Sequence, residues 1–266
     1  GTRIDSRTPT QVSGLTDATA VAAGSFHTCA LRSGGGVRCW GSNSGGALGT
    51  ATTANASSTP VDVAGLTDAV ALAAGSGSCA VRRSGQVACW GTQGLVLTPT
   101  GTPVYQATAV AGLANIVSVS FGSSHMCALR GDQRVLCWGN NLNGQLGDGS
   151  STARSSPTLV TGLSDAVAIS VGDSHSCALR AGGGVACWGY AGTGAIGAFP
   201  PSQSVPVNVL TPRDIPDLAD VTALQSQGKH SCALTRQGRV LCWGEGILGS
   251  GSVARNYTPV PVFGGA

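Results

Sequence analysis

The stretch HTCALRSGGGVRCWG, residues 27–41, places two cysteines ten positions apart around three glycines and ends in a Trp-Gly pair. The same pattern returns four more times in the chain, at residues 77–91, 125–139, 175–189 and 230–244. Apolar residues on both sides of a glycine-rich centre are typical of a β-hairpin. In this hairpin we expect Leu31 to face Val37 and Cys29 to face Cys39.

The repeats recur about every fifty residues. The first cysteines of the pairs are spaced by 50, 48, 50 and 55 residues, at Cys29, Cys79, Cys127, Cys177 and Cys232. An apolar alternation such as TDAVALAAG (67–75) precedes each hairpin, and a glycine-rich loop and a proline-led segment such as SSTPVDVAGL (57–66) follow it. Period-two alternation and glycine punctuation indicate strands rather than helices.

Each repeat thus supplies four short strands, which is the content of one propeller blade. We therefore predict an all-β chain, a β-propeller of four-stranded blades with five repeats visible, either a closed five-blade ring or part of a larger propeller. Residues 1–266 are expected to form a single propeller domain. Six proline-led outer segments accompany only five hairpins, because RTPTQVSGL (7–15) and YTPVPVFGGA (257–266) are equivalent.

The composition limits the partners that the protein can have. Of the 266 residues, 42% are hydrophobic and only 10% are charged, so the chain can bury a core and is not disordered. A formal charge of +3 is too weak to indicate binding to nucleic acid or to an anionic membrane. The longest apolar run of the repeats, AVALAAGSGSCAV (69–81), is short and broken by glycine, so we predict no membrane span.

The third repeat carries the most complete motif, CALRGDQRVLCWGNNLNGQLGDGSS (127–151). It resembles the repeat of the regulator of chromosome condensation family, and the likeness covers nearly the whole chain. The matching positions are Gly122, His125, Ala128, Leu129, Trp138, Gly139, Asn140, Gly144, Gln145, Leu146 and Gly147. Repeat one has Ala47 in place of the usual glutamine, repeats four and five read GAIG and GILG, and repeat two lacks the loop motif.

The resemblance implies a β-propeller, usually of seven blades in this family. Its best-known member is a nuclear exchange factor for a small GTPase that also docks on chromatin, an activity not expected here because nothing matches a partner-binding insertion. Another relative is a secreted bacterial inhibitor of β-lactamase that binds through propeller loops. The paired cysteines and the abundance of Gly, Ala and Arg resemble secreted bacterial members, so we expect a secreted or cell-surface protein.

All ten cysteines fall into five pairs with nine residues between the partners. Facing cysteines on neighbouring strands fit disulfides in an oxidising compartment. Buried free thiols and a metal site are the alternatives, although zinc sites favour closer spacings and redox sites favour one distinctive C-x-x-C. The predicted bridges join Cys29 to Cys39, Cys79 to Cys89, Cys127 to Cys137, Cys177 to Cys187 and Cys232 to Cys242.

Histidine, tryptophan and arginine also recur at fixed positions of the repeat. The histidines and tryptophans belong to the blade motif, at His27, His125, His175, His230, Trp40, Trp90, Trp138, Trp188 and Trp243. Each histidine is expected to tie a blade to a loop, with a metal or pH-sensing ring as the alternative. The arginines either line a solvated face or form a ring that binds anionic groups, at Arg32, Arg82, Arg130 and Arg180.

Two short segments match the acceptor pattern for N-glycosylation, with Asn55 and Asn256 as the acceptors. Such short patterns also arise by chance in a chain rich in Ser and Thr. Both asparagines are candidate modification sites.

Catalysis normally requires one cluster of different reactive side chains, but here the histidines, arginines and cysteines recur from repeat to repeat. The sequence also shows no nucleotide- or cofactor-binding loop. We therefore predict a non-enzymatic extracellular scaffold without a cofactor that binds a protein or a glycan. The irregular loops at 92–108 and 190–217 are the expected contact segments. The alternative is a structural subunit, for example of a surface layer, fibre or adhesin, that forms a homopolymer through the surplus terminal strand.

Overall fold

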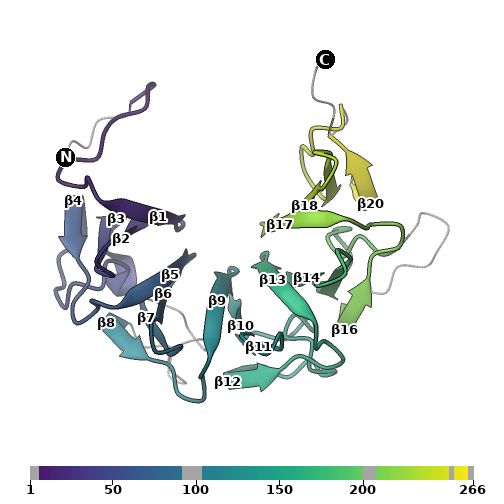
Figure 1. Cartoon of the computed structure of the whole chain (residues 1–266), viewed down its shortest axis with the longest axis horizontal. Helices are drawn as coiled ribbons and strands as arrows, with labels where there is room; N and C mark the ends of the chain where they lie inside the picture. Colours follow the sequence, from purple (N-terminus) through teal and green to yellow (C-terminus); the bar gives the residue numbers. More distant parts are fainter. Residues whose placement is uncertain (1–5, 92–103, 200–207, 252–254, 263–266) are drawn as a thin grey trace. The chain divides into compact units, whose positions relative to one another are not determined.

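The computed structural model describes residues 6–91, 104–199, 208–251 and 255–262. In these residues twenty strands form five antiparallel sheets of four strands each, in chain order (Figure 1). The chain is an all-β propeller of four-stranded blades, as the repeat predicts. Among the same residues, no helix is long and apolar enough to cross a membrane.

Each blade consists of a first strand, the two strands of the cysteine hairpin and a proline-associated fourth strand. Blade one contains β1 (Ala18–Ala23), β2 (His27–Arg32), β3 (Val37–Ser42) and β4 (Ala56–Asp62). Blade two contains β5 (Ala69–Ala74), β6 (Gly77–Arg82), β7 (Val87–Gly91) and β8 (Val104–Ala109). Blade three contains β9 (Ile116–Phe121), β10 (His125–Arg130), β11 (Val135–Gly139) and β12 (Arg154–Leu159).

The same order holds in the two remaining blades. Blade four contains β13 (Ala166–Val171), β14 (His175–Arg180), β15 (Val185–Tyr190) and β16 (Asn208–Asp214). Blade five contains β17 (Val221–Gln227), β18 (His230–Thr235), β19 (Val240–Gly244) and β20 (Asn256–Pro261).

The strands belong to two compact units, residues 1–119 and 120–266. Blades one and two lie in the first unit, whereas β10–β12 and blades four and five lie in the second. The boundary between the units falls within β9. That residues 1–266 act as a single domain stays a prediction.

The hairpin has the register expected from the sequence, with Leu31 opposite Val37 and Cys29 opposite Cys39. Gly35 supplies the positive φ of 83° that the tight turn requires. The glycine of the Trp-Gly pair has a different role. At Gly41 the ladder between β3 and β4 shifts register, φ is 107°, and a Cβ atom would lie 2.8 Å from the Cα of His27. Only glycine fits this bulge.

The hydrophobic core lies between consecutive blades. Between blades four and five it contains the aliphatic hairpin residues Leu179 and Val185, together with Val221 and the buried indole of Trp243. Corresponding clusters lie between blades one and two and between blades three and four. In each of these three pairs, the later blade covers one face of the earlier one.

Each of the five hairpins pairs with a fourth strand from its own blade, namely β4, β8, β12, β16 or β20. Pro60, Pro157, Pro212 and Pro259 lie within these edge strands, where a missing N–H donor is tolerated. The equivalent segment at residues 7–15 forms no strand. The sequence counts this segment as surplus, and every described hairpin already pairs with a fourth strand of its own blade.

Two loops that the sequence predicts to contact a ligand lie only partly in the described structure. Residues 92–103 of the first and residues 200–207 of the second fall outside it. Their described neighbours enter β8 and β16.

Candidate binding site

All five cysteine pairs are disulfides, and each joins the second strand of a blade to the third. The bridges are Cys29–Cys39, Cys79–Cys89, Cys127–Cys137, Cys177–Cys187 and Cys232–Cys242. The paired Cα atoms are 4.0–4.1 Å apart, because the cysteines are directly opposed in the ladder. Of the three interpretations left open by the sequence, the disulfide is the one that the structure contains.

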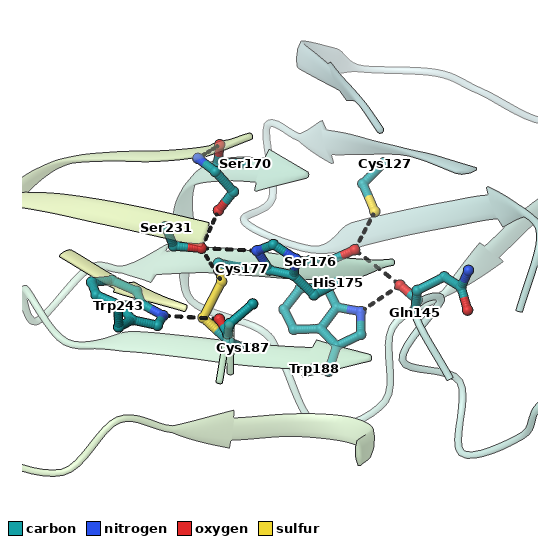
Figure 2. Close-up of a disulfide and its surroundings, with 12 residues drawn as sticks. Cys127, Gln145, Ser170, His175, Ser176, Cys177, Cys187, Trp188, Ser231 and Trp243 are labelled. Carbon is teal, nitrogen blue, oxygen red and sulfur yellow. Dashed lines mark hydrogen bonds between the residues drawn. A yellow bond between two sulfur atoms is a disulfide. The ribbon is translucent and has the colours of Figure 1, made fainter. Parts of the chain in front are cut away.

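The motif histidines connect neighbouring blades. Nε2 of His27 lies 2.7 Å from the Ser78 hydroxyl of blade two. In the second unit, His125 lies 2.8 Å from the hydroxyl of Ser176. His175 lies 2.9 Å from the hydroxyl of Ser231 (Figure 2). The structure thus places these three histidines in structural contacts between blades.

Burial keeps these imidazoles neutral. Desolvation lowers the pKa of His125 to about 3 and that of His175 to about 4. Burial also lowers the pKa of His27. The single proton of the Ser176 hydroxyl is donated to the carbonyl of Gln145, so Nε2 of His125 is the donor in its bond to Ser176. The tautomer of His125 is therefore decided by the neighbouring blade.

Replacing Ser231 by alanine tests the stabilising role of these contacts. The Ser231→Ala variant leaves Nε2 of the buried His175 without its hydroxyl partner, so we expect the free energy of unfolding to fall by about 1–3 kcal/mol. Urea denaturation followed by tryptophan fluorescence measures this change. Ser155→Ala on the exposed side of β12 is the matched control, expected to change stability by less than about 0.5 kcal/mol. Equal stability of the two variants contradicts the assignment.

The motif tryptophans also connect blades. Nε1 of Trp188 donates to the carbonyl of Gln145 at 2.9 Å (Figure 2). Nε1 of Trp243 donates to the carbonyl of Ala195, also at 2.9 Å. In the first unit Trp90 donates to the carbonyl of Ala47 at 3.0 Å. In these three pairs of blades, the loop after the hairpin of the first blade therefore presents a carbonyl to the indole of the second.

The four arginines proposed as a binding ring form ion pairs with aspartates near them in their own blades. Three of them lie 2.8–3.0 Å from the aspartate that precedes the first strand, in the pairs Arg32–Asp17, Arg82–Asp68 and Arg180–Asp165. Arg130 instead pairs with Asp132 of its own turn at 2.9 Å. That they bind an anionic ligand stays a prediction, and such a ligand would compete with these aspartates.

The two glycosylation acceptors differ in accessibility. Asn55 is exposed before β4, whereas Asn256 is half-buried at the start of β20. Modification of either asparagine stays a prediction, and Asn55 is the more accessible of the two.

A charged cavity lies between blades four and five, at the end where β13 leads into β14. Its volume is about 370 Å³. Four ionised side chains line it together with His175, Tyr190 and Thr193, and they are Asp173, Lys229, Glu245 and Arg255. We call these four residues the charged cluster.

The two acidic and two basic side chains of the charged cluster balance in formal charge, but they are only partly paired with one another. Arg255 contacts one oxygen of Glu245 at 2.9 Å, whereas the ammonium of Lys229 is 3.5 Å from the other oxygen. Asp173 accepts a hydrogen bond from Ser123. The Lys229 side chain is more than half exposed, so most of its donor capacity faces the cavity and solvent.

A cavity at the equivalent place between blades one and two serves as an internal comparison. Ser25, Phe26, Ser42 and Ser76 stand there where the charged cavity has Asp173, Ser174, Tyr190 and Lys229. No residue that lines this second cavity carries a full charge. The fold therefore supplies a cavity between blades, and its side chains differ from one pair of blades to another.

Sequence reasoning did not identify the charged cluster. Its members are distributed over residues 173–255, and only their placement between two blades brings them together. The sequence did contain one indication of the cluster, namely Lys229. It is the single lysine among the fifteen Lys and Arg residues, and the other repeats have serine or phenylalanine at its position.

The chain matches two sequence models of the regulator of chromosome condensation (RCC1) repeat. One covers residues 34–81 and 132–179, and the other covers residues 18–47, 116–145, 166–194 and 228–249. Together these matches span more than half of the chain.

Several solved structures share the fold. Human WBSCR16 is 20% identical, with a TM-score of 0.82 over 94% of this chain and 68% of that one. Prp20p from Saccharomyces cerevisiae is 20% identical, with a TM-score of 0.61 over 92% of this chain and 76% of that one. The ectodomain of the Physcomitrella patens receptor kinase CR4 is 22% identical, with a TM-score of 0.55 over 88% of this chain and 54% of that one.

Proposed function

Because the chain belongs to the regulator of chromosome condensation repeat family, we propose that it is a non-enzymatic scaffold that binds a protein or glycan. The similar Prp20p binds Gsp1p and histones, which is an example of protein binding by this fold. Disulfides within blades and hydrogen bonds between blades hold the scaffold rigid. Its loop residues can therefore bind a ligand with little loss of conformational entropy.

The charged cavity between blades four and five is the proposed contact site. The observation that carries this proposal is the contrast with the uncharged cavity between blades one and two. Lys229 and Arg255 offer donors to carboxylate, carbonyl or hydroxyl groups, while Asp173 and Glu245 accept hydrogen bonds. A peptide segment with acidic groups or a saccharide fits such a mixed set of donors and acceptors.

The variant Lys229→Ser tests this site, because serine is the residue that repeats two, three and four carry at the same position. We expect the variant to fold normally and to lose affinity for its ligand at least about tenfold, the effect of losing one charged hydrogen bond. Binding is measured on arrays of defined peptides and glycans, followed by titration of each hit.

Arg83→Ser is the matched control, since it removes the same charge from an exposed turn of blade two. Its affinity is expected to equal that of the unaltered protein. Equal binding by Lys229→Ser and Arg83→Ser places the ligand elsewhere, and an absence of hits on both arrays contradicts the scaffold proposal.

We further propose an extracellular or cell-surface location. Five disulfides and no free cysteine favour an oxidising compartment. Two of the structural relatives are ectodomains of plant receptor kinases, which is consistent with this location. Nucleic acid and membrane lipid remain outside the proposed partners, given the weak net charge.

Self-association through residues 7–15 is the second candidate function. This segment resembles the fourth strand of a blade but forms no strand in the structure, so its backbone is available to pair with the sheet edge of another molecule. Deletion of residues 7–15 is expected to abolish such assembly, as measured by light scattering.

A further inference from the structure

An arginine at the end of the second strand holds a carboxylate in three of the blades. Nε of this arginine donates to both carboxylate oxygens of the aspartate that precedes the first strand, at 2.8–3.2 Å. The pairs are Arg32–Asp17, Arg82–Asp68 and Arg180–Asp165. At this position of the blade, the edge of the guanidinium that contains Nε is therefore a carboxylate-binding group.

Blade three keeps the arginine, as Arg130, but its repeat has Asn115 where the other four repeats have aspartate. Nε of Arg130 is buried and has no hydrogen-bond partner in the part of the chain that the structure describes. Its Nη2 lies 2.9 Å from a carboxylate oxygen of Asp132. A buried donor without an acceptor is costly, so the Arg130 guanidinium gains from an additional carboxylate oxygen.

The turn that follows Arg130 departs from the repeat at two further positions. Asp132 stands where the other repeats have Gly, Ser or Gln, and Gln133 stands where all four have glycine. Gln133 has a φ of 67°, in the left-handed region that favours glycine. Residues 131–134 are exposed. Departures of this kind from the pattern of a fold are expected at functional sites.

The turn is held in place at both ends. The Cys127–Cys137 disulfide closes its hairpin, and the backbone N–H of Ala166 donates to the carbonyl of Gln133 at 3.0 Å. Arg130 and all of these residues belong to the second compact unit. Arg130 therefore lies on a rigid support, which limits the conformational entropy lost when a ligand binds.

We propose that Arg130 binds a carboxylate side chain of a partner protein, in an acidic peptide segment that docks on the turn of residues 130–134. The carboxylate takes the place beside Nε that an aspartate of the same blade takes in three other repeats. It displaces Asp132, whose half-exposed ion pair contributes little stability. A carboxylate is favoured over a sulfated glycan because the fold itself binds carboxylates at the three equivalent positions.

This inference rests on the proposed protein binding, but its site is separate from the charged cluster. An array of defined peptides tests it. Each peptide carries Asp or Glu at its centre and has a twin with Asn or Gln there, and heparin is the sulfated-glycan probe. We expect the full chain to bind acidic peptides, and to bind neither their amide twins nor heparin. An array without acidic hits, or equal binding of the amide twins or of heparin, overturns the proposal.

Substitution of Arg130 tests the site itself. Arg130→Thr introduces the residue that repeat five carries there, so the variant is expected to fold and to bind acidic peptides at least about tenfold more weakly. Arg130→Lys keeps the charge but not the planar fork, and a similar loss is expected. Arg83→Thr, in an exposed turn of blade two, is the matched control and is expected to bind normally. Equal binding by Arg130→Thr and Arg83→Thr contradicts the site.

Removal of the competing carboxylate is expected to act in the opposite direction. Asp132→Asn leaves Arg130 without its ion pair, so the affinity for acidic peptides is expected to rise about two- to fivefold, the effect of one exposed ion pair. Titration calorimetry measures the change, and circular dichroism checks that each variant is folded. A fall in affinity means that Asp132 itself contacts the partner, and that result overturns the proposed exchange of carboxylates.

Lys229→Ser separates this site from the charged cavity. Peptides that lose affinity in Arg130→Thr are expected to bind Lys229→Ser as they bind the unaltered protein, because the charged cavity is not lined by Arg130. If Lys229→Ser abolishes the binding of all acidic peptides and Arg130→Thr changes none, the Arg130 proposal is wrong and the cavity proposal stands. The reverse result supports the Arg130 site and contradicts the cavity as the site for acidic peptides.

Discussion

Reduction of the five disulfides is expected to unfold the protein in the absence of denaturant. Each bridge joins residues separated by 10 positions, so each removes about 2–3 kcal/mol of chain entropy from the unfolded state. Together they contribute about 10–15 kcal/mol, which is as large as the whole free energy of unfolding of an ordinary domain. Circular dichroism and the fluorescence of the five tryptophans, with and without a phosphine reductant, measure this effect.

Removal of a single bridge measures how much one disulfide contributes to the free energy of unfolding. The paired substitution Cys177→Ala with Cys187→Ala is expected to lower the free energy of unfolding by about 2–3 kcal/mol from the lost bridge alone. Alkylation of the denatured protein is expected to label no cysteine before reduction and all ten after it. A reduced protein with an unchanged urea midpoint means that the bridges do not stabilise the fold, and the extracellular proposal then loses its support.

Acidification to pH 5 is expected to lower the free energy of unfolding by about 4 kcal/mol, because two buried histidines are protonated only in the unfolded state. The pKa is about 3 for His125 and about 4 for His175 in the folded state, against about 6.5 in the unfolded chain. Between those values only the unfolded state takes up the proton, so the stability present above pH 6.5 is lost as the pH falls. At pH 5 each histidine accounts for about 2 kcal/mol.

Urea denaturation at a series of pH values between 5 and 8 measures this loss. Asp17 and Asp148 do not account for it, because their pKa values lie below the usual 3.8 and their contributions disappear only in stronger acid. The double variant His125→Asn with His175→Asn is expected to be less stable at neutral pH and to lose the part of the pH dependence that these two histidines contribute, while His27 retains its own part. A variant that retains the slope of the unaltered protein contradicts the assignment.

Local patterns in the sequence determined the blade. The alternation around GGG at 34–36 and the spacing of Cys29 and Cys39 suffice to predict the hairpin, its register and its bridge, because strand pairing across a short turn follows from side-chain alternation. The five repeats extend that prediction to the whole chain. Residues 7–15, which the repeats count as surplus, form no strand, because each described hairpin already has its fourth strand.

Contacts between blades were decided by the tertiary structure alone. The sequence marked His175 as a motif residue but not Ser231 as its partner, since the two lie 56 residues apart. In the same way, Asp173, Lys229, Glu245 and Arg255 form one cluster only because two blades bring their loops to one cavity. Alternation along a strand reports which side chains share a face of one sheet. Which face meets which depends on the packing of complete sheets, and short-range spacing carries no information about it.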